Sequence, residues 1–437
     1  MPVNLLPGAV PIFAVLLLAP FVGWAISNRA WYALGFLVFV VIGALGVLSP
    51  MAAFGAYAFL VPFESVTLVA DTGGATITKL VGIAAAGALL ANAIVRRRFV
   101  RPPPVALAVA ALFVWVLASF AWAVDLERSQ SQLVTAISLV AMYVAAISFQ
   151  ASETQLRRVC VLTAIGGVLA AAAIVMFGFE ADAAGVARGT LSLGEREANA
   201  NAAAQSLLLP LTLAVAALVS TRSALVRLAG IGGIAIIASG IFLTVSRSSL
   251  AAIALMFCLL LYRFRVRWQV LVAVGILGLL VPLMPGVFFD RIGNVFSGED
   301  ATGSGRTLIW GVGLDALPQY GIFGAGFANF PVVYNIFSHT TNARGAHNEY
   351  LGTWVDLGVI GLVLFVVALV GHLRLGKWTG SATLRPAAAA AQAACLGFLF
   401  IAFFSDVLWR KAFWIPWILA IWLSRLPTTS TSRSTDG

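Results

Sequence analysis

Three side chains in this sequence have the charge and the proton affinity needed for chemistry on an anionic substrate. Arg247 and Arg306 carry planar guanidinium groups, which can make two parallel hydrogen bonds to phosphate oxygens. His347 has an imidazole that titrates near neutral pH and can accept a proton from a hydroxyl. Together they predict a site in which arginines neutralise the charge growing on a pyrophosphate leaving group while His347 deprotonates the attacking hydroxyl.

The sequence around each arginine places it at a predicted helix boundary. Residues 228–262 form one apolar run with Arg247 just past its middle, and an arginine inside hydrocarbon costs about 2.5–3.5 kcal/mol or more. We therefore expect two helices with a tight break at 244–249. Arg306 follows Gly303-Ser304-Gly305, and a glycine-rich turn into a helix exposes N–H groups that favour anions. Simpler interpretations stay open: Arg247 could snorkel at a helix end or hold a lipid phosphate, and Arg306 could lie on a surface helix.

His347 directly precedes an apolar segment, and the residues after it admit two interpretations. Asn348 is a good helix cap and Glu349 is favoured near the positive end of a helix dipole, so both could be structural or could bind substrate. Helical spacing would place Tyr350 and Trp354 on the same face as His347. Their rings could stack on a sugar or belong to the aromatic belt of a membrane interface.

Composition identifies the elements that must position these residues as membrane helices. Of the 437 residues, 61% are hydrophobic and 10% charged, whereas soluble domains carry about 25% charged residues. Apolar stretches approach the roughly 20 residues that cross a bilayer as a helix. We therefore predict an all-α polytopic membrane protein with about 12–14 transmembrane helices, in apolar segments at about 8–26, 30–48, 51–69, 76–94, 105–123, 132–149, 157–178, 202–220, 228–245, 248–262, 268–288, 348–371, 387–405 and 411–424. The third segment is weak because Pro62 and Glu64 interrupt it, and it could be re-entrant.

Basic clusters set the expected orientation of this single membrane domain. Arg96–Arg98 and Arg101 form the strongest cluster, which the positive-inside rule places in the cytoplasm. Every later break then alternates consistently, so topology explains much of the net charge of +10 and no nucleic-acid partner is expected. On the outer side lie a smaller loop at 180–200 and a large loop at about 289–347 that contains short helices. A disordered cytoplasmic tail is predicted at 426–437, whereas the side of the N-terminus stays open.

Four motifs resemble, in order, those of the O-antigen ligase and O-antigen polymerase superfamily of bacterial membrane proteins. They are Arg188-Gly189-Thr190 with Asn199-Ala200-Asn201, Ser246-Arg247-Ser248-Ser249-Leu250, Gly305-Arg306-Thr307-Leu308-Ile309-Trp310, and His347-Asn348-Glu349-Tyr350-Leu351 with Asp356-Leu357-Gly358. The first motif departs from the commoner form, since Ala200 stands where a proline precedes the final asparagine. This departure puts the role of Asn201 in question.

The resemblance implies a glycosyltransferase of surface-polysaccharide biosynthesis in the bacterial inner membrane. Its donor would be an undecaprenyl-diphosphate-linked glycan used at the periplasmic face, without a metal or other cofactor. Its acceptor would be lipid A-core in a ligase or the growing glycan in a polymerase, and the motifs do not distinguish the two. A transporter or flippase of lipid-linked glycan is the alternative. The implied catalytic residues are His347, Arg306 and Arg247, and the candidate substrate-binding residues are Arg188, Asn201, Asn348, Glu349 and Tyr350.

The sequence shows no pattern typical of a metal centre. The three cysteines each fall within an apolar segment, and no cluster of cysteine, histidine or carboxylate residues has metal-ligand spacing. Membrane lipids are the remaining expected partners, because so much of the chain must face hydrocarbon.

Overall fold

A computed structural model describes residues 49–64, 77–95, 100–181, 187–191, 199–264, 268–280, 305–375, 381 and 383–426. The all-α class is confirmed: the described chain is helical apart from one short antiparallel hairpin, in which β1 (Phe179–Ala181) pairs with β2 (Ala187–Gly189). Several predictions lie outside the described residues. They are the first two apolar segments, the basic residues Arg96–Arg98, the end of the 268–288 segment, residues 289–304 of the large loop and the tail from 427 onward.

Helices of two lengths build the bundle. Seven of them are long and apolar enough to cross a membrane among the residues described. These are α4 (Ile77–Val95), α6 (Leu126–Ile147), α7 (Glu153–Phe177), α8 (Ala200–Ser206) continued by α9 (Leu208–Ser220), α10 (Ala224–Leu243), α11 (Arg247–Phe264) and α17 (Glu349–Leu375). Shorter apolar helices are α3 (Pro50–Leu60) with the 3-10 turn η1 (Val61–Phe63), α5 (Val105–Ala118) with η2 (Ser119–Ala121), α12 (Trp268–Leu280), α18 (Arg385–Ile401) and α19 (Lys411–Ser424).

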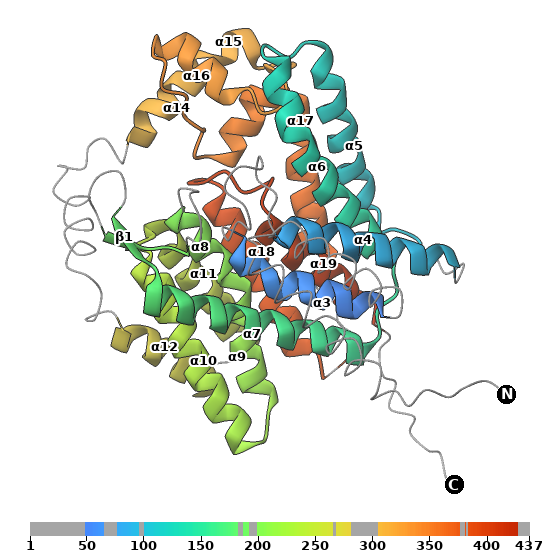
Figure 1. The fold of residues 1–437 in the computed structure, drawn as a ribbon, viewed down its shortest axis with the longest axis vertical. Coiled ribbons are helices and arrows are strands. Elements are labelled where there is room, and N and C mark those ends of the chain that lie inside the picture. The colour runs from blue at the N-terminus through green and yellow to red at the C-terminus, as the bar shows by residue number, and fades with distance from the viewer. Residues whose placement is uncertain are drawn as a thin grey trace, which may run out of the picture.

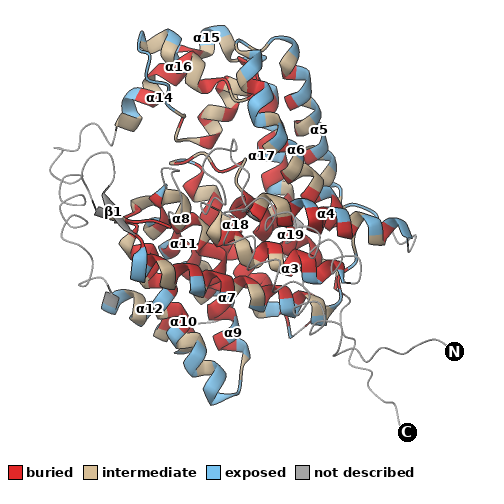
Figure 2. Cartoon of the chain, in the orientation of Figure 1, coloured by how far each residue is buried: buried red, intermediate tan, exposed pale blue. Residues whose placement is uncertain are grey.

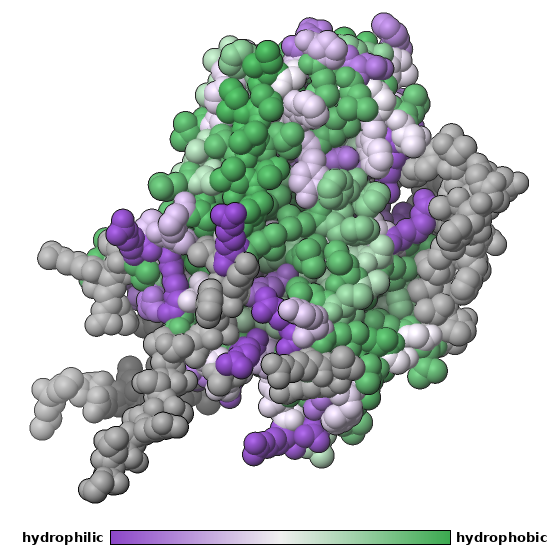
Figure 3. All heavy atoms as spheres, turned by 180° about the vertical axis from the view of Figure 1, so that it is seen from behind, coloured by the Kyte–Doolittle hydropathy of each residue, from purple (hydrophilic) through white to green (hydrophobic). Residues whose placement is uncertain are grey.

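The centre of the bundle is formed by α18 and α19. Nearly every residue of α19 is buried, and α18 presents an alanine-rich run that lets neighbouring helices approach closely. Figure 2 shows buried residues through the middle of the molecule, on these two helices and on the helices around them. Apolar side chains on the outer helices are exposed instead, for example Leu107 at 72% and Val114 at 63%. The broad hydrophobic surface in Figure 3 is therefore the surface that lipid would cover.

The breaks between helices collect in two groups at opposite ends of the bundle. At the basic end, Val100 N donates to Ser148 O at 3.2 Å and Arg425 Nη2 donates to Arg101 O at 3.1 Å. At the other end, which we call the site end, Asp125 N donates to Asn329 Oδ1 at 2.7 Å. Helix α6 runs from Leu126 at the site end to Ile147 at the basic end. The breaks at these two ends are the ones that the charge pattern assigns to opposite sides of the membrane.

The weak third segment forms α3 and η1 and ends at the site end. Glu64, directly after η1, makes an ion pair with Lys411 at the start of α19, with 2.7 Å between Nζ and Oε1. Lys411 is buried, so this partner satisfies a charge that would otherwise be costly in a low-dielectric environment. The acidic residue that weakened the sequence signal therefore has a tertiary partner.

The large loop folds into short helices that pack on the beginning of α17. They are α14 (Arg306–Asp315), α15 (Leu317–Tyr320) and α16 (Phe330–Ser338), which lie together at the top of Figure 1 beside α17. Helix α17 contains a non-helical residue, Gly358, with φ +69°. Val359 N and Gly321 O pair at 2.8 Å, and Gly326 N and Asp356 O pair at 2.9 Å, so the loop hydrogen-bonds directly to the kink.

Glycine is required where these two backbones meet. A Cβ on Gly358 would lie 2.0 Å from Ile322 O, and one on Gly324 would lie 2.2 Å from Asp356 O. Both residues also have positive φ, which residues with a side chain adopt at a cost. The kink thereby fixes the α14–α16 unit on α17.

Candidate functional site

The smaller loop and the break between α10 and α11 meet through Arg188. Its Nε donates to Thr244 O at 2.9 Å, and its Nη2 donates to Asn201 Oδ1 at 3.0 Å. Helix α10 ends at Leu243 and α11 begins at Arg247, so the predicted break is confirmed. Arg188 and Asn201 therefore hold the backbone that precedes Arg247, and the structure brings the first two predicted motifs together.

Arg306 is the first residue of α14, directly after a glycine in the left-handed conformation. Gly305 has φ +76°, and a Cβ there would lie 3.1 Å from Nη1 of Arg344. Burial lowers the pKa of the Arg306 guanidinium from its ordinary value; the positive charge of Arg247 lowers it further and the carboxylate of Asp406 opposes this. Arg247 and Arg306 are thus close enough to repel each other, an arrangement that an anionic ligand would stabilise.

His347 lies just before α17 in a strained backbone conformation. Its φ is +48°, and the preceding carbonyl, Ala346 O, accepts a hydrogen bond from Trp310 Nε1 at 3.1 Å. The expected helical alignment of His347 with Tyr350 and Trp354 is therefore wrong, because α17 begins only at Glu349. In the left-handed conformation, the side chain of His347 points in a different direction from the one it would have inside a continuing α-helix.

The electrostatic surroundings of His347 favour its neutral form. Partial burial lowers the pKa of the imidazole below its ordinary value. Asp406 acts against this shift, whereas the positive charges of Arg306, Arg410 and Arg344 each lower the pKa further. An imidazole that is neutral at pH 7 can accept a proton from a hydroxyl.

Asp406 and Arg410 are members of this cluster that the sequence interpretation missed. They lie in the break between α18 and α19, and Arg410 Nε donates to Asp406 O at 2.8 Å. The Asp406 carboxylate faces the segment before His347, since a Cβ on Gly345 would lie 2.8 Å from its Oδ2. A signal was present: this charged break falls on the outer side in the predicted alternation of segments.

Glu349 attaches the beginning of α17 to the break that carries Asp406. Its Oε2 accepts hydrogen bonds from Val407 N at 2.5 Å and Leu408 N at 2.9 Å, and its own N–H donates to Ala402 O at 2.7 Å. The side chain is only 6% exposed. The Glu349 carboxylate therefore contacts backbone amides of the chain itself and sets the distance between Asp406 and His347.

The other two predicted substrate-binding residues of this motif also contact the protein. Asn348 caps α17, its Oδ1 accepting from Leu351 N at 3.1 Å. The Tyr350 hydroxyl donates to Leu399 O at 3.0 Å, and its ring lies 4.5 Å from that of Phe403 between centroids. Tyr350 thus points toward α18, away from the cluster around His347.

Asp356, farther along α17, also has a partner within the chain. Its Oδ1 accepts from Phe330 N, the first N–H of α16, at 2.5 Å. This contact caps α16 and adds to the attachment of the large loop on the kinked helix. His339, the other histidine of the loop, lies exposed at the end of α16 with φ +52°.

These features define a polytopic helical membrane protein with a basic, histidine-containing site where the breaks of one end converge. A model of the O-antigen ligase family matches residues 232–366, and this match supports a relationship of that part of the chain to the O-antigen ligase family. Together with the apolar helices, the match supports a membrane glycan-processing enzyme. No curated protein sequence shows a significant match to the chain.

The matched region contains some of the cluster but not all of it. It begins within α10 and ends within α17, so it includes Arg247, Arg306 and His347. Arg188 lies before the match, and Asp406 and Arg410 lie after it. The structure therefore brings residues from outside the matched region to the candidate site.

Proposed function

We propose that this enzyme transfers glycan from a polyprenyl-diphosphate-linked donor at the periplasmic face of the inner membrane. The proposal rests on the proximity of Arg306 and Arg247, whose positive charges act on each other. Beside them lies the imidazole of His347, which burial and neighbouring arginines keep neutral. A diphosphate supplies the negative charge that stabilises two neighbouring guanidinium groups. The membrane beside the site would hold the lipid of the donor while its sugar stays in water.

The reaction that fits this site is an inverting displacement at the anomeric carbon. The acceptor hydroxyl loses its proton to His347 as its oxygen forms the new glycosidic bond. The bond from the anomeric carbon to the phosphate oxygen breaks, and the electron pair leaves with the lipid diphosphate. Arg247 and Arg306 stabilise the charge that grows on that leaving group.

Asp406 has a positioning role in this scheme. Its negative charge raises the pKa of His347 and so stabilises the imidazolium that forms when the proton is accepted. A carboxylate beside a catalytic imidazole has this effect in other enzymes. Arg188 and Glu349 hold the two breaks in place through hydrogen bonds to backbone groups, and the Asn201 side chain orients Arg188.

Both acceptors that the family resemblance implies remain compatible with this scheme. A ligase would present a hydroxyl of lipid A-core, and a polymerase would present a hydroxyl of a growing lipid-linked glycan. The arginine and histidine side chains act on the donor and on the attacking proton, which both acceptors share. The alternative function, movement of lipid-linked glycan across the membrane, needs neither a general base nor a leaving group.

A reconstituted assay separates these functions. Purified protein in liposomes is given a polyprenyl-diphosphate-linked glycan and an acceptor in excess EDTA, and the product is identified by mass spectrometry. We expect a new glycosidic bond with the diphosphate donor and none with a monophosphate-linked donor, because the leaving group loses charge that the arginines bind. Glycan that crosses the bilayer without bond formation would indicate the transporter and overturn the proposal.

The side of the membrane is tested by labelling single cysteines in intact cells. We expect cysteines introduced at exposed positions 307 and 339 to react with an impermeant maleimide, since both lie at the site end. A cysteine at position 158 at the basic end should react only after permeabilisation. Cytoplasmic reactivity at 307 would contradict the proposed face.

A further inference from the structure

A large cavity opens at the basic end of the bundle, at the opposite ends of the helices that form the candidate site. It has a volume of about 1660 Å³ and lies among α7, α9, α10, α11 and α18. Its lining includes Ser220 and Thr221, where α9 ends, and Arg263, in the last turn of α11. Pockets for drug-sized ligands measure about 300–1,000 Å³, so this cavity is large enough for a larger ligand.

We propose that this cavity binds an anionic phospholipid from the leaflet at the basic end, with its phosphate among the arginines and its acyl chains along α7 and α10. This goes beyond glycan transfer and concerns residues remote from His347. The proposal rests on the charge of the cavity's rim, on the apolar character of its walls and on its position at the membrane surface.

The rim of the cavity is strongly basic. It is lined by five arginines and, among the residues that the structure describes, by no aspartate or glutamate; the arginines are Arg157, Arg222, Arg227, Arg263 and Arg385. Two of them have neutral partners: Arg227 Nε donates to Thr221 O at 3.2 Å, and Arg263 Nη2 donates to Gln392 Oε1 at 2.8 Å. Such contacts orient a guanidinium but leave its charge uncompensated, as phosphate binding requires.

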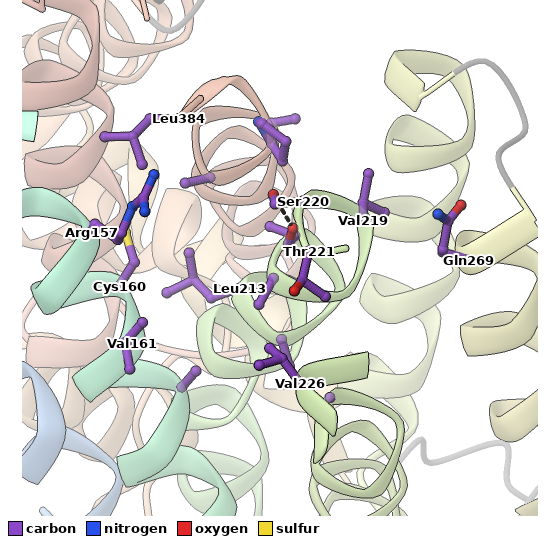
Figure 4. A pocket seen from close by; sticks show the side chains of 18 of the residues that line it. Arg157, Cys160, Val161, Leu213, Val219, Ser220, Thr221, Val226, Gln269 and Leu384 are labelled. Carbon is purple, nitrogen blue, oxygen red and sulfur yellow. Dashed lines mark hydrogen bonds between the residues drawn. The ribbon is translucent and has the colours of Figure 1, made fainter. Parts of the chain in front are cut away.

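The walls below the rim are apolar. Figure 4 shows Val161 of α7, Leu213 and Val219 of α9 and Val226 of α10 around the same space as Arg157. Val161 and Val226 are 48% and 47% exposed, although both are apolar. Side chains of this kind are suited to the hydrocarbon of an acyl chain, whereas a free phosphate ion would gain nothing from them.

Basic pockets between membrane helices bind anionic lipid head groups because the phosphate is attracted to arginine while the chains stay in hydrocarbon. The positive-inside rule alone predicts arginines scattered over this end. Here arginines from α7, α10, α11 and α18 converge on one cavity instead. Arg158, adjacent to Arg157 on α7, is exposed but does not line it, and this difference supplies a matched control.

The test uses the full chain in nanodiscs of phosphatidylcholine, to which dioleoyl phosphatidylglycerol is added, with bound lipid counted by native mass spectrometry. We expect preferential retention of phosphatidylglycerol. The double substitution Arg157→Gln with Arg385→Gln should weaken its binding by about 30-fold, since each arginine near a lipid surface contributes about one kilocalorie per mole. Arg158→Gln with Arg374→Gln, which removes two charges without touching the cavity, should change binding less than about twofold.

A variant of the wall keeps the proposal testable if loss of charge disturbs folding. Ala164→Trp narrows the cavity between α7 and α10 while all five arginines remain, and we expect it to lose phosphatidylglycerol as well. Gel filtration reports whether each variant is intact. Equal loss in both double variants would mean a general surface attraction and overturn the proposal. Displacement of the lipid by millimolar inorganic phosphate, or stronger retention of polyprenyl phosphate than of phosphatidylglycerol, would overturn it too.

Discussion

The carboxylate of Glu349 accepts a hydrogen bond from the backbone N–H of Leu408 at 2.9 Å, across 59 positions of sequence. This contact joins the start of α17 to the break between α18 and α19. His347 precedes one partner and Asp406 precedes the other, so the contact holds the two titratable groups of the candidate site side by side. The packing of the bundle therefore fixes the electrostatic interaction between His347 and Asp406.

Removing this carboxylate should loosen the site. Glu349→Ala leaves Val407 N and Leu408 N without an acceptor in a buried place, and each unpaired group costs about 1–3 kcal/mol. We expect a lower melting temperature in detergent together with a loss of transfer. Glu349→Gln keeps one acceptor oxygen and should be milder. Glu127→Ala, at an exposed position at the start of α6, is the control; an equal effect there would argue against the contact.

The kink of α17 should tolerate no side chain. Gly358→Ala places a Cβ 2.0 Å from Ile322 O at a residue with φ +69°, and strain of this kind costs about 1–3 kcal/mol. We expect reduced thermal stability and weaker attachment of α14–α16. Gly311→Ala is the matched control, since a Cβ there meets nothing within 4 Å and alanine favours a helix. A variant Gly358→Ala as stable as the control would refute this account of the kink.

We expect that lysine cannot substitute functionally for either of the proposed diphosphate-binding arginines. An ammonium offers a point charge, whereas the planar fork of Arg247 or Arg306 makes two parallel bonds to phosphate oxygens. We expect Arg247→Lys and Arg306→Lys each to lower turnover by about 10²–10³-fold, comparable with removal of one transition-state donor. Arg158→Lys should be unaffected. Turnover is measured in liposomes at matched protein content, and wild-type rates in both site variants would remove these arginines from the mechanism.

Removing a positive or a negative charge near His347 should shift the pH profile of transfer in opposite directions. His347 must be neutral to accept a proton, so activity is full at pH values above its pKa. Activity falls as the pH drops through this pKa, which is lowered from the ordinary value of about 6.5. Arg344 lowers this pKa and Asp406 raises it. Arg344→Gln should therefore move the acidic limb of the profile to higher pH, and Asp406→Asn should move it to lower pH. Shifts in the same direction would contradict the assignment.

The sequence predicts the helices well because their lengths and apolar character are fixed by the bilayer that they cross. The break before Arg247 is an example: a charge in the middle of an apolar run leaves a turn as the least costly solution. The start of α17 is predicted to within a residue, but the kink at Gly358 is not. Its cause is the approach of Gly324 and Ile322 from a distant segment.

Part of the candidate site is also beyond prediction from local sequence. The roles of Arg247, Arg306 and His347 can be predicted from the sequence alone, because they follow from the chemistry of their side chains. Asp406 and Arg410 carry no motif, and only the packing of α19 against α18 and α17 brings them to His347. Glu349 could be interpreted either way from sequence, because its partners Val407 and Leu408 are set by tertiary structure.

The role of His347 as the general base is tested by comparing glycan transfer by His347→Gln with transfer by His339→Gln. Both histidines lie in the same loop with positive φ, but only His347 lies among Arg306, Asp406 and Arg410. The rate of glycan transfer is measured in liposomes from the diphosphate-linked donor, with donor binding and protein level followed in parallel. We expect His347→Gln to lose about 10²–10⁴-fold in rate with donor binding retained, and His339→Gln to keep the wild-type rate. Wild-type transfer by His347→Gln would contradict its role as the general base.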